Sequence, residues 1–151
     1  MHAAVVEVDT ETGQYRVLKY VVVSDSGTMI NPMVVNGQIH GIVAHGLGAA
    51  TNEEFVYDQD GQLLTPTFLE YSCPQASDMP ELIVDHLVTP SPFSAYGVKG
   101  MGEGSNPVPA VIAGAVEDAL KPFAIRIRQS RITPEYVLGL IESAGSRGVN
   151  K

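Results

Sequence analysis

The sequence NPMVVNGQIHGIVAHGLG, residues 31–48, decides the fold because it predicts one long helix. Asn31 is a favourable N-cap, and Pro32 suits the first helical position, where a missing N–H costs nothing. From Val35 to Leu47 the apolar residues recur at helical spacing. Four residues of the stretch are nonetheless glycines: Gly37, Gly41, Gly46 and Gly48. Each costs about 0.5–1 kcal/mol relative to alanine inside a helix, so the close approach of another backbone or of a ligand must offset the loss.

Extended segments lie on both sides of this helix. Residues 2–8 and 14–24 are rich in β-branched side chains and are separated by a turn that contains Gly13, which predicts a β-hairpin. Further strands are predicted at residues 54–57 and 62–64, which form a second hairpin, and at 82–88 and 124–128. Antiparallel hairpins are therefore favoured over βαβ units.

Two more helices are predicted towards the C-terminus. Asn106 and Pro107 provide a cap and a first position, and apolar residues follow at helical spacing to Leu120, where Pro122 ends the pattern. Thr133-Pro134-Glu135 begins a third helix that runs to about Ile141. We expect one α+β unit over residues 1–142, with antiparallel hairpins packed against about three helices, and a flexible tail over residues 143–151.

The composition excludes several classes of protein. The 151 residues carry 9 basic and 17 acidic side chains, a net charge of −8, which argues against nucleic acid or an anionic membrane surface as partner. No apolar run is long enough to span a membrane. The single cysteine, Cys73, permits no internal disulfide and no zinc site of four thiolates. With no signal peptide at the N-terminus, a cytoplasmic location is expected.

The best candidate for chemistry is the glycine-rich segment GVKGMGEG, residues 97–104, which contains Glu103. Four glycines let a ligand approach the backbone closely. The carboxylate precedes the cap of the second helix by three residues, where the helix dipole favours its ionised form, as a general base requires. A solvent-exposed Glu103, or one paired with Lys99, is the alternative, and composition alone favours that alternative.

The second candidate is Gln38, whose amide on the glycine-rich helix suits the polar edge of a cofactor. Tight packing of that helix through its glycines explains the same pattern equally well. His40 and His45 are five residues apart, which does not align two ligands on one helical face, so no metal site is expected and polar contacts or core positions are favoured for both. Cys73 has no activating neighbour and is interpreted as structural.

Several motifs in order resemble one family, the molybdenum hydroxylases, which include xanthine dehydrogenase, aldehyde oxidoreductase and carbon monoxide dehydrogenase. The chain is similar to the C-terminal part of their molybdenum-binding large subunit, from about residue 3 to 141. The matching segments are Asp25-Ser26-Gly27, Ile30-Asn31-Pro32, Gly46-Leu47-Gly48 and residues 35–41, 54–58, 97–104 and 115–120. The bacterial branch that includes carbon monoxide dehydrogenase resembles the chain most.

The resemblance implies a role for each candidate. Glu103 matches the family's general base beside the molybdenum, and Gln38 matches the glutamine that contacts the pterin. Gly37, Gly100 and Gly102 then let the cofactor approach the backbone. The implied cofactor is molybdopterin with molybdenum, in the cytosine dinucleotide form typical of bacterial members. Ile42 and His45 depart from the family, which often has glycine and glutamine there.

A full family subunit is several times longer, so the resemblance implies a shared cofactor and a multi-subunit complex. The expected partners are the remainder of the molybdenum-binding subunit, iron–sulfur and FAD subunits, and a small-molecule substrate; one cysteine cannot hold an iron–sulfur cluster. The alternative is a non-catalytic fragment or assembly module that keeps the scaffold without the cofactor. A piece of a larger subunit is expected to expose a contiguous apolar surface where its partner belongs, and to self-associate through that surface when isolated; a wholly polar surface would weigh against a split subunit.

Overall fold

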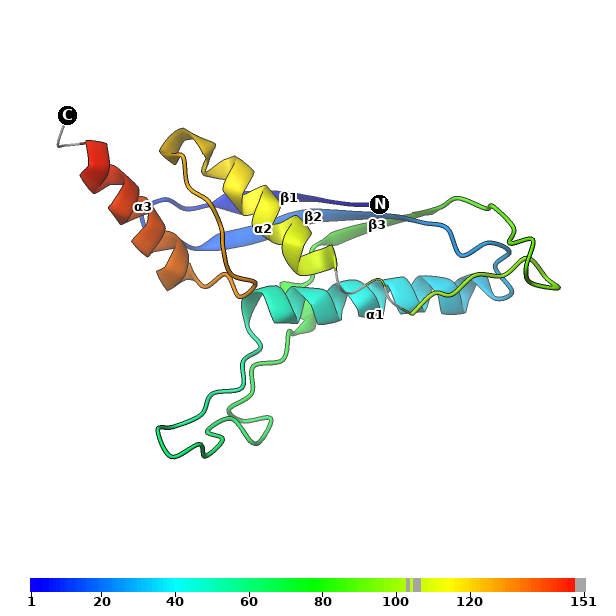
Figure 1. Ribbon diagram of the computed structural model, residues 1–151, viewed down its shortest axis with the longest axis horizontal. Coiled ribbons are helices and arrows are strands. Elements are labelled where there is room, and N and C mark those ends of the chain that lie inside the picture. The colour runs from blue at the N-terminus through cyan, green and yellow to red at the C-terminus, as the bar shows by residue number, and fades with distance from the viewer. Residues whose placement is uncertain (103, 105–106, 149–151) are drawn as a thin grey trace.

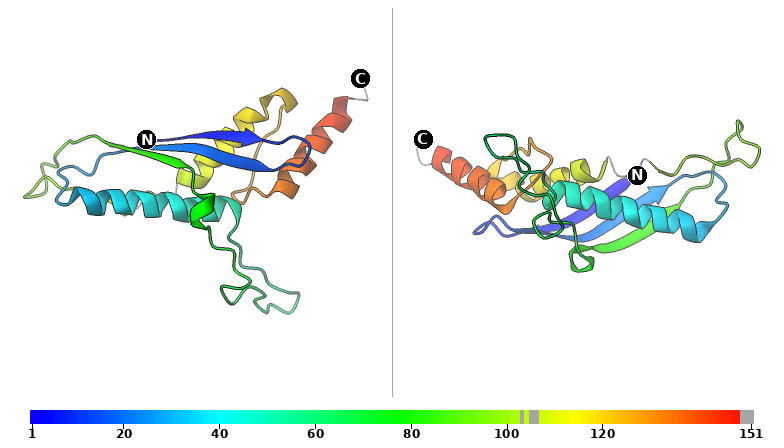
Figure 2. Two further views of the ribbon diagram at one scale, coloured as in Figure 1. Left: turned by 180° about the vertical axis from the view of Figure 1, so that it is seen from behind. Right: turned by 90° about the horizontal axis from the view of Figure 1, so that it is seen from below.

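The computed structural model describes residues 1–102, 104 and 107–148, which form an α+β fold (Figure 1). This confirms the predicted fold class. The elements in chain order are β1 (His2–Val8), β2 (Tyr15–Ser24), α1 (Pro32–Thr51), η1 (Ala76–Asp78), β3 (Glu81–His86), α2 (Pro107–Ala119), η2 (Lys121–Phe123) and α3 (Pro134–Gly148). The helices α1 and α2 lie against the sheet, and α3 lies at the end of the molecule opposite the start of α1 (Figures 1 and 2).

The described strands form one sheet in the order β1-β2-β3. β1 and β2 pair antiparallel as the predicted hairpin, with Gly13 in the turn at a φ of 73°. β2 and β3 pair in parallel, from Lys19 opposite Glu81 to Ser24 opposite His86. The expectation of antiparallel hairpins alone is therefore wrong for β3. Parallel neighbours need a long crossover, and α1 provides it between β2 and β3.

Residues 124–128 are not a strand, contrary to the sequence prediction, because side chains accept the hydrogen bonds of their backbone N–H groups. Ile127 N donates to Glu117 Oε2 (3.0 Å), and Arg128 N donates to the Tyr136 hydroxyl (3.1 Å). Arg126 Nη1 also donates to Glu117 Oε1 (2.6 Å). These bonds bind the segment to α2 and α3 and replace the ladder that a strand would require.

The second predicted hairpin is reduced to one isolated bridge, between Tyr57 and Leu63. It belongs to an arm, residues 52–75, that leaves the end of α1 and returns to η1 (Figure 1). A two-stranded hairpin outside a larger sheet is marginally stable, which explains the short pairing. At the C-terminus α3 continues to Gly148, beyond Ile141, where the sequence predicted its end. Residues 149–151 of the expected tail lie outside the described residues.

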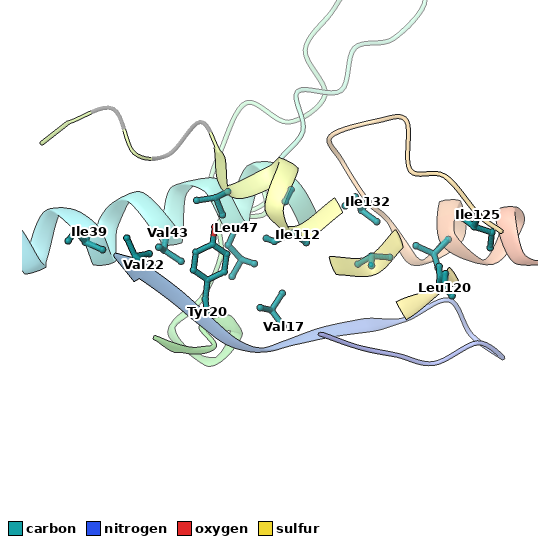
Figure 3. Close-up of a cluster of buried hydrophobic side chains, with 14 residues drawn as sticks. Val17, Tyr20, Val22, Ile39, Val43, Leu47, Ile112, Leu120, Ile125 and Ile132 are labelled. Carbon is teal, nitrogen blue, oxygen red and sulfur yellow. The ribbon is translucent and has the colours of Figure 1, made fainter. Parts of the chain in front are cut away.

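The hydrophobic core lies between the sheet and the helices (Figure 3). Tyr20 of β2 is fully buried there among side chains of α1 and α2, and its hydroxyl bonds His2 Nδ1 (3.1 Å). Burial raises the pKa of the Tyr20 phenol to about 12. From α2, Val108, Ile112 and Val116 are all fully buried, as the predicted apolar ladder requires.

Much apolar surface remains exposed. The accessible surface is 9822 Å², whereas a compact monomer of 16.1 kDa is expected to expose about 7,400 Å². Largely exposed apolar side chains occur in the arm (Phe68, Leu69), in the loop after β3 (Phe93) and at the start of α1 (Met33). These residues lie in three separate segments, so a contiguous apolar surface stays a prediction. None of the helices in the described part of the chain is both long and apolar enough to cross a bilayer.

We expect Ile112→Ala to lower the free energy of unfolding by about 2–5 kcal/mol, because the fully buried side chain leaves a cavity. Urea titration followed by circular dichroism measures the loss. Ile30→Ala is the matched control, since Ile30 is 70% exposed and its truncation should have little effect on stability. Equal losses in the two variants would contradict the core described here.

Candidate cofactor-binding site

One face of α1 is open to the outside of the chain. Val34, Gly37, Gln38, Gly41 and His45 follow helical spacing, and all five are exposed. The helix starts as predicted: the side chain of its N-cap accepts hydrogen bonds from the backbone of the first turn. None of its 20 residues is Asp, Glu, Lys or Arg. An exposed helical face without charged residues is unusual in a soluble domain and indicates that another surface covers it.

The opposite face of α1 lies in the core, with Ile39, Val43 and Leu47 buried. The glycines of α1 differ in what surrounds them. A Cβ on Gly48 would meet Glu53 and Pro74, so this glycine is required by packing within the chain. A Cβ on Gly37 or Gly41 would meet no atom within 4 Å.

Gly37 and Gly41 therefore form an open strip beside Gln38. Gln38 forms no hydrogen bond with any other described residue, so both ends of its amide are available. A helix surface with two missing side chains and a free amide fits a flat, polar group that comes from outside the chain. Packing of α1 on a neighbour within this chain, the alternative reading of these glycines, accounts for Gly48 and not for Gly37 and Gly41.

The first residues of the glycine-rich segment pair with the turn after β2. Gly27 and Val98 form an isolated antiparallel bridge, Thr28 N donates to Gly97 O (3.0 Å), and Lys99 N donates to Ser26 O (2.9 Å). Gly27 and Gly97 have positive φ values of 66° and 70°. A Cβ on Gly27 would overlap the carbonyl oxygen of Gly97. Both glycines are therefore required by this close pairing.

The segment then passes along α1. Met101 packs against the core, and its Sδ accepts a hydrogen bond from Ser24 Oγ (3.5 Å). A Cβ on Gly104 would lie 3.1 Å from the Ile42 side chain, so the segment touches α1 one helical turn after Gln38. Gly100 and Gly102 are exposed, and a Cβ on Gly102 would meet nothing within 4 Å. Glu103 lies outside the described residues, so its role stays a prediction.

An ion-pair cluster holds the start of this segment. Asp25 Oδ2 accepts from Lys99 Nζ (2.8 Å) and from the Thr89 hydroxyl. Asp25 Oδ1 accepts from the backbone N–H groups of Gly27 (2.9 Å) and Thr89 (3.2 Å). The Lys99 ammonium, the Thr89 hydroxyl and these N–H groups hold the pKa of the Asp25 carboxyl well below its usual range. Lys99, the partner considered for Glu103, is thus already paired with Asp25.

A hollow of about 230 Å³ separates the turn after β2, the start of α1 and the glycine-rich segment. Ser26, Asn31, Val34 and Met101 are among its lining residues. The Ser26 hydroxyl is buried and has no hydrogen-bond partner in the described part of the chain. A buried hydroxyl without a partner is costly, so a polar group or water is expected beside it.

The remaining candidates are His40, His45 and Cys73. His40 and His45 are both exposed, so a core position, one of the two readings favoured for them, is wrong. The described residues hold no group of three or more His, Cys, Asp and Glu side chains that could bind a metal. Cys73 is an exposed free thiol in the arm.

The chain was compared with known proteins. A family model described as "Molybdopterin cofactor-binding domain" matches residues 1–80. The chain belongs to this family. The chain is also 42% identical over 149 residues to the nicotine 6-hydroxylase large subunit of Paenarthrobacter nicotinovorans. It is 36% identical over 119 residues to the carbon monoxide dehydrogenase large chain of Hydrogenophaga pseudoflava. These matches cover 95% and 78% of this chain.

Among solved structures, the domain superposes on quinoline 2-oxidoreductase from Pseudomonas putida 86 with a TM-score of 0.88 and 44% identity over 93% of this chain. These findings confirm the resemblance to the large subunit of molybdenum hydroxylases, which are oxidoreductases. The domain spans 18% of the nicotine 6-hydroxylase large subunit, 15% of the carbon monoxide dehydrogenase chain and 18% of the quinoline 2-oxidoreductase chain.

The lowered pKa of Asp25 gives a pH-dependent contribution to stability. That contribution is complete above about pH 4, the ordinary range of an aspartate in an unfolded chain, and is lost as the pH falls towards the lower pKa of the folded state. We expect Asp25→Asn to destabilise the domain at neutral pH, and the difference from wild type to shrink below about pH 4. Urea unfolding at several pH values measures it.

Asp118→Asn is the control for this experiment, because Asp118 is exposed and forms no hydrogen bond with another described residue. Its curve of unfolding free energy against pH should follow that of the wild type. A difference between Asp25→Asn and wild type that grows as the pH falls would contradict the cluster.

Proposed function

We propose that this domain contributes one wall of a molybdenum hydroxylase active site, with Glu103 as general base and Gln38 as a contact to the pterin. Gly37, Gly100 and Gly102 then allow the cofactor to reach the backbone. The observation that carries the proposal is the open strip of α1: a Cβ on Gly37 or Gly41 would meet no atom within 4 Å, and the Gln38 amide has no hydrogen-bond partner among the described residues. Membership of the molybdopterin cofactor-binding domain family supports a pterin as the flat, polar group that would cover this strip.

The glycine-rich segment supplies the second element of the proposed site. Met101 and Gly104, on either side of Glu103 in the sequence, contact the core and Ile42 of α1. α2 begins at Pro107, and the positive end of a helix dipole favours an ionised carboxylate nearby. An ionised, positioned carboxylate is what general-base catalysis needs.

When bound, the molybdenum cofactor would supply the oxidising centre and activate the oxygen that is transferred. The part of this chain would be to accept a proton at the Glu103 carboxylate and to orient the pterin through the Gln38 amide. Exclusion of water would come from surfaces that cover the uncharged face of α1. We assign the cofactor as the cytosine dinucleotide form, as the resemblance to bacterial members implies.

The domain is proposed to work only in a complex. Its excess accessible surface and the uncharged outer face of α1 support burial against the remainder of a molybdenum-binding subunit, with which it would share the cofactor. Iron–sulfur and FAD subunits are proposed to carry electrons away, and a small molecule is the proposed substrate. A cytoplasmic location is proposed for the complex.

We expect Glu103→Gln to abolish turnover in the assembled complex, with molybdenum content close to that of the wild type, because the amide cannot accept the proton but keeps the shape of the side chain. Native mass spectrometry identifies the larger subunit in the purified complex, and elemental analysis gives its molybdenum content. Glu7→Gln on the exposed side of β1 is the control, for which wild-type activity is expected.

Normal activity in Glu103→Gln would remove this residue from the mechanism. A chain that never co-purifies with a larger molybdopterin subunit would instead support the alternative of a non-catalytic fragment or assembly module.

We expect Gln38→Ala to lower the pterin content of the purified complex several-fold, since one good polar contact is worth about 1 kcal/mol or more. The pterin is measured by its fluorescence after oxidative release. Gln62→Ala, in the exposed arm, is the matched control and should leave the pterin content unchanged. Wild-type pterin content in Gln38→Ala would argue against a contact at this amide.

A further inference from the structure

We propose that Asp25, Thr89 and Lys99 form a clamp that fixes the start of the glycine-rich segment beside α1, so that the three are positioning residues for the general base. The inference rests on the proposed function, in which Glu103 of that segment is the base. The three residues come from two connections: Asp25 lies in the turn after β2, and Thr89 and Lys99 lie in the connection from β3 to α2. Figure 2 shows these two connections side by side at the same end of the molecule.

The clamp uses every acceptor of one carboxylate. Oδ2 of Asp25 receives the Lys99 ammonium and the Thr89 hydroxyl, and Oδ1 receives two backbone N–H groups. Lys99 Nζ also donates to Thr89 Oγ1 (2.5 Å), which closes a triangle of side chains. An isolated surface ion pair contributes little to stability, but here five hydrogen bonds meet at one point, and three of them join the turn after β2 to the connection from β3 to α2.

The backbone holds the same point independently. The bridge between Gly27 and Val98 and the bond from Lys99 N to Ser26 O fix the direction in which the chain leaves the clamp. The position of Lys99 is therefore defined by both its backbone and its side chain. Further along the segment, Met101 Sδ accepts a hydrogen bond from Ser24 Oγ at the end of β2, and Gly104 lies against Ile42 of α1.

A glycine-rich segment needs such anchors more than other loops do. Glycine loses more conformational entropy on ordering than any other residue, so the segment does not hold a fixed path by itself. A base displaced by about 1 Å can lose about 100-fold in rate. Because Lys99 of the clamp directly precedes Gly100 and lies four residues before Glu103 in the sequence, loss of the clamp should be seen in the segment's order and in the rate, while the core stays intact.

The test compares Lys99→Met, which removes the charge, with Lys99→Arg, which keeps it. Hydrogen–deuterium exchange of the chain is measured for a peptide that covers residues 94–102, and kcat, KM and molybdenum content are measured for the assembled complex. For Lys99→Met we expect at least about 10-fold faster exchange in this peptide and about 10-fold lower kcat, with KM and molybdenum content unchanged. Lys99→Arg should restore both readouts to within about 3-fold of wild type.

Lys19→Met is the matched control, because Lys19 forms a comparable ion pair (3.2 Å, with Glu81) away from the segment, and it should change neither readout. Wild-type exchange and kcat in Lys99→Met, with Glu103→Gln inactive, would overturn the clamp while leaving the proposed function in place. Loss of molybdenum, or faster exchange throughout the core, would make Lys99 a general stabilising residue and would also overturn the clamp. Normal activity of Glu103→Gln would refute the proposed function, and the exchange data would still decide whether the clamp orders the segment.

Discussion

The structure depends on the burial of one side of α1 against β2 and α2. Tyr20, Val43 and Ile112 are buried there, each with at most 1% of its surface exposed, and the core extends from this contact to the other elements. This contact also determines which side of α1 faces outward. An exposed helix face without charged residues is unusual in water, and the chain itself covers only the opposite face of α1. We therefore interpret the exposed side of α1 as the side that would contact the cofactor.

The sequence predicted those elements whose signals are local. Asn31 and Pro32 define the start of α1, and the apolar spacing that ends at Leu120 defines α2, because caps and periodicity act over a few residues. The parallel pairing of β2 with β3 was not predicted, since a strand's composition does not specify its neighbour. Residues 124–128 have a strand-like composition, but Glu117 takes their backbone N–H groups, which is a tertiary effect.

The candidate site was predictable to a different extent. Gln38 and the glycines around it stand out because each glycine is costly in a helix, and the structure brings Gly104 to within one helical turn of Gln38. The role of Asp25 could not be found from spacing, because its partners are 64 and 74 residues away. The positive φ values of Gly27 and Gly97 result from the close pairing of these two segments. In the sequence, however, these two glycines look like those of ordinary turns.

The single cysteine, Cys73, offers one site for chemical labelling of the arm. Cys73 is exposed at the base of residues 52–75 and is the only thiol in the sequence. A fluorophore attached there by thiol chemistry would sit at one defined place, next to the exposed aromatic side chains of the arm. Its emission would then report in real time when another polypeptide covers this part of the molecule, so assembly of the proposed complex could be followed with the sequence unchanged.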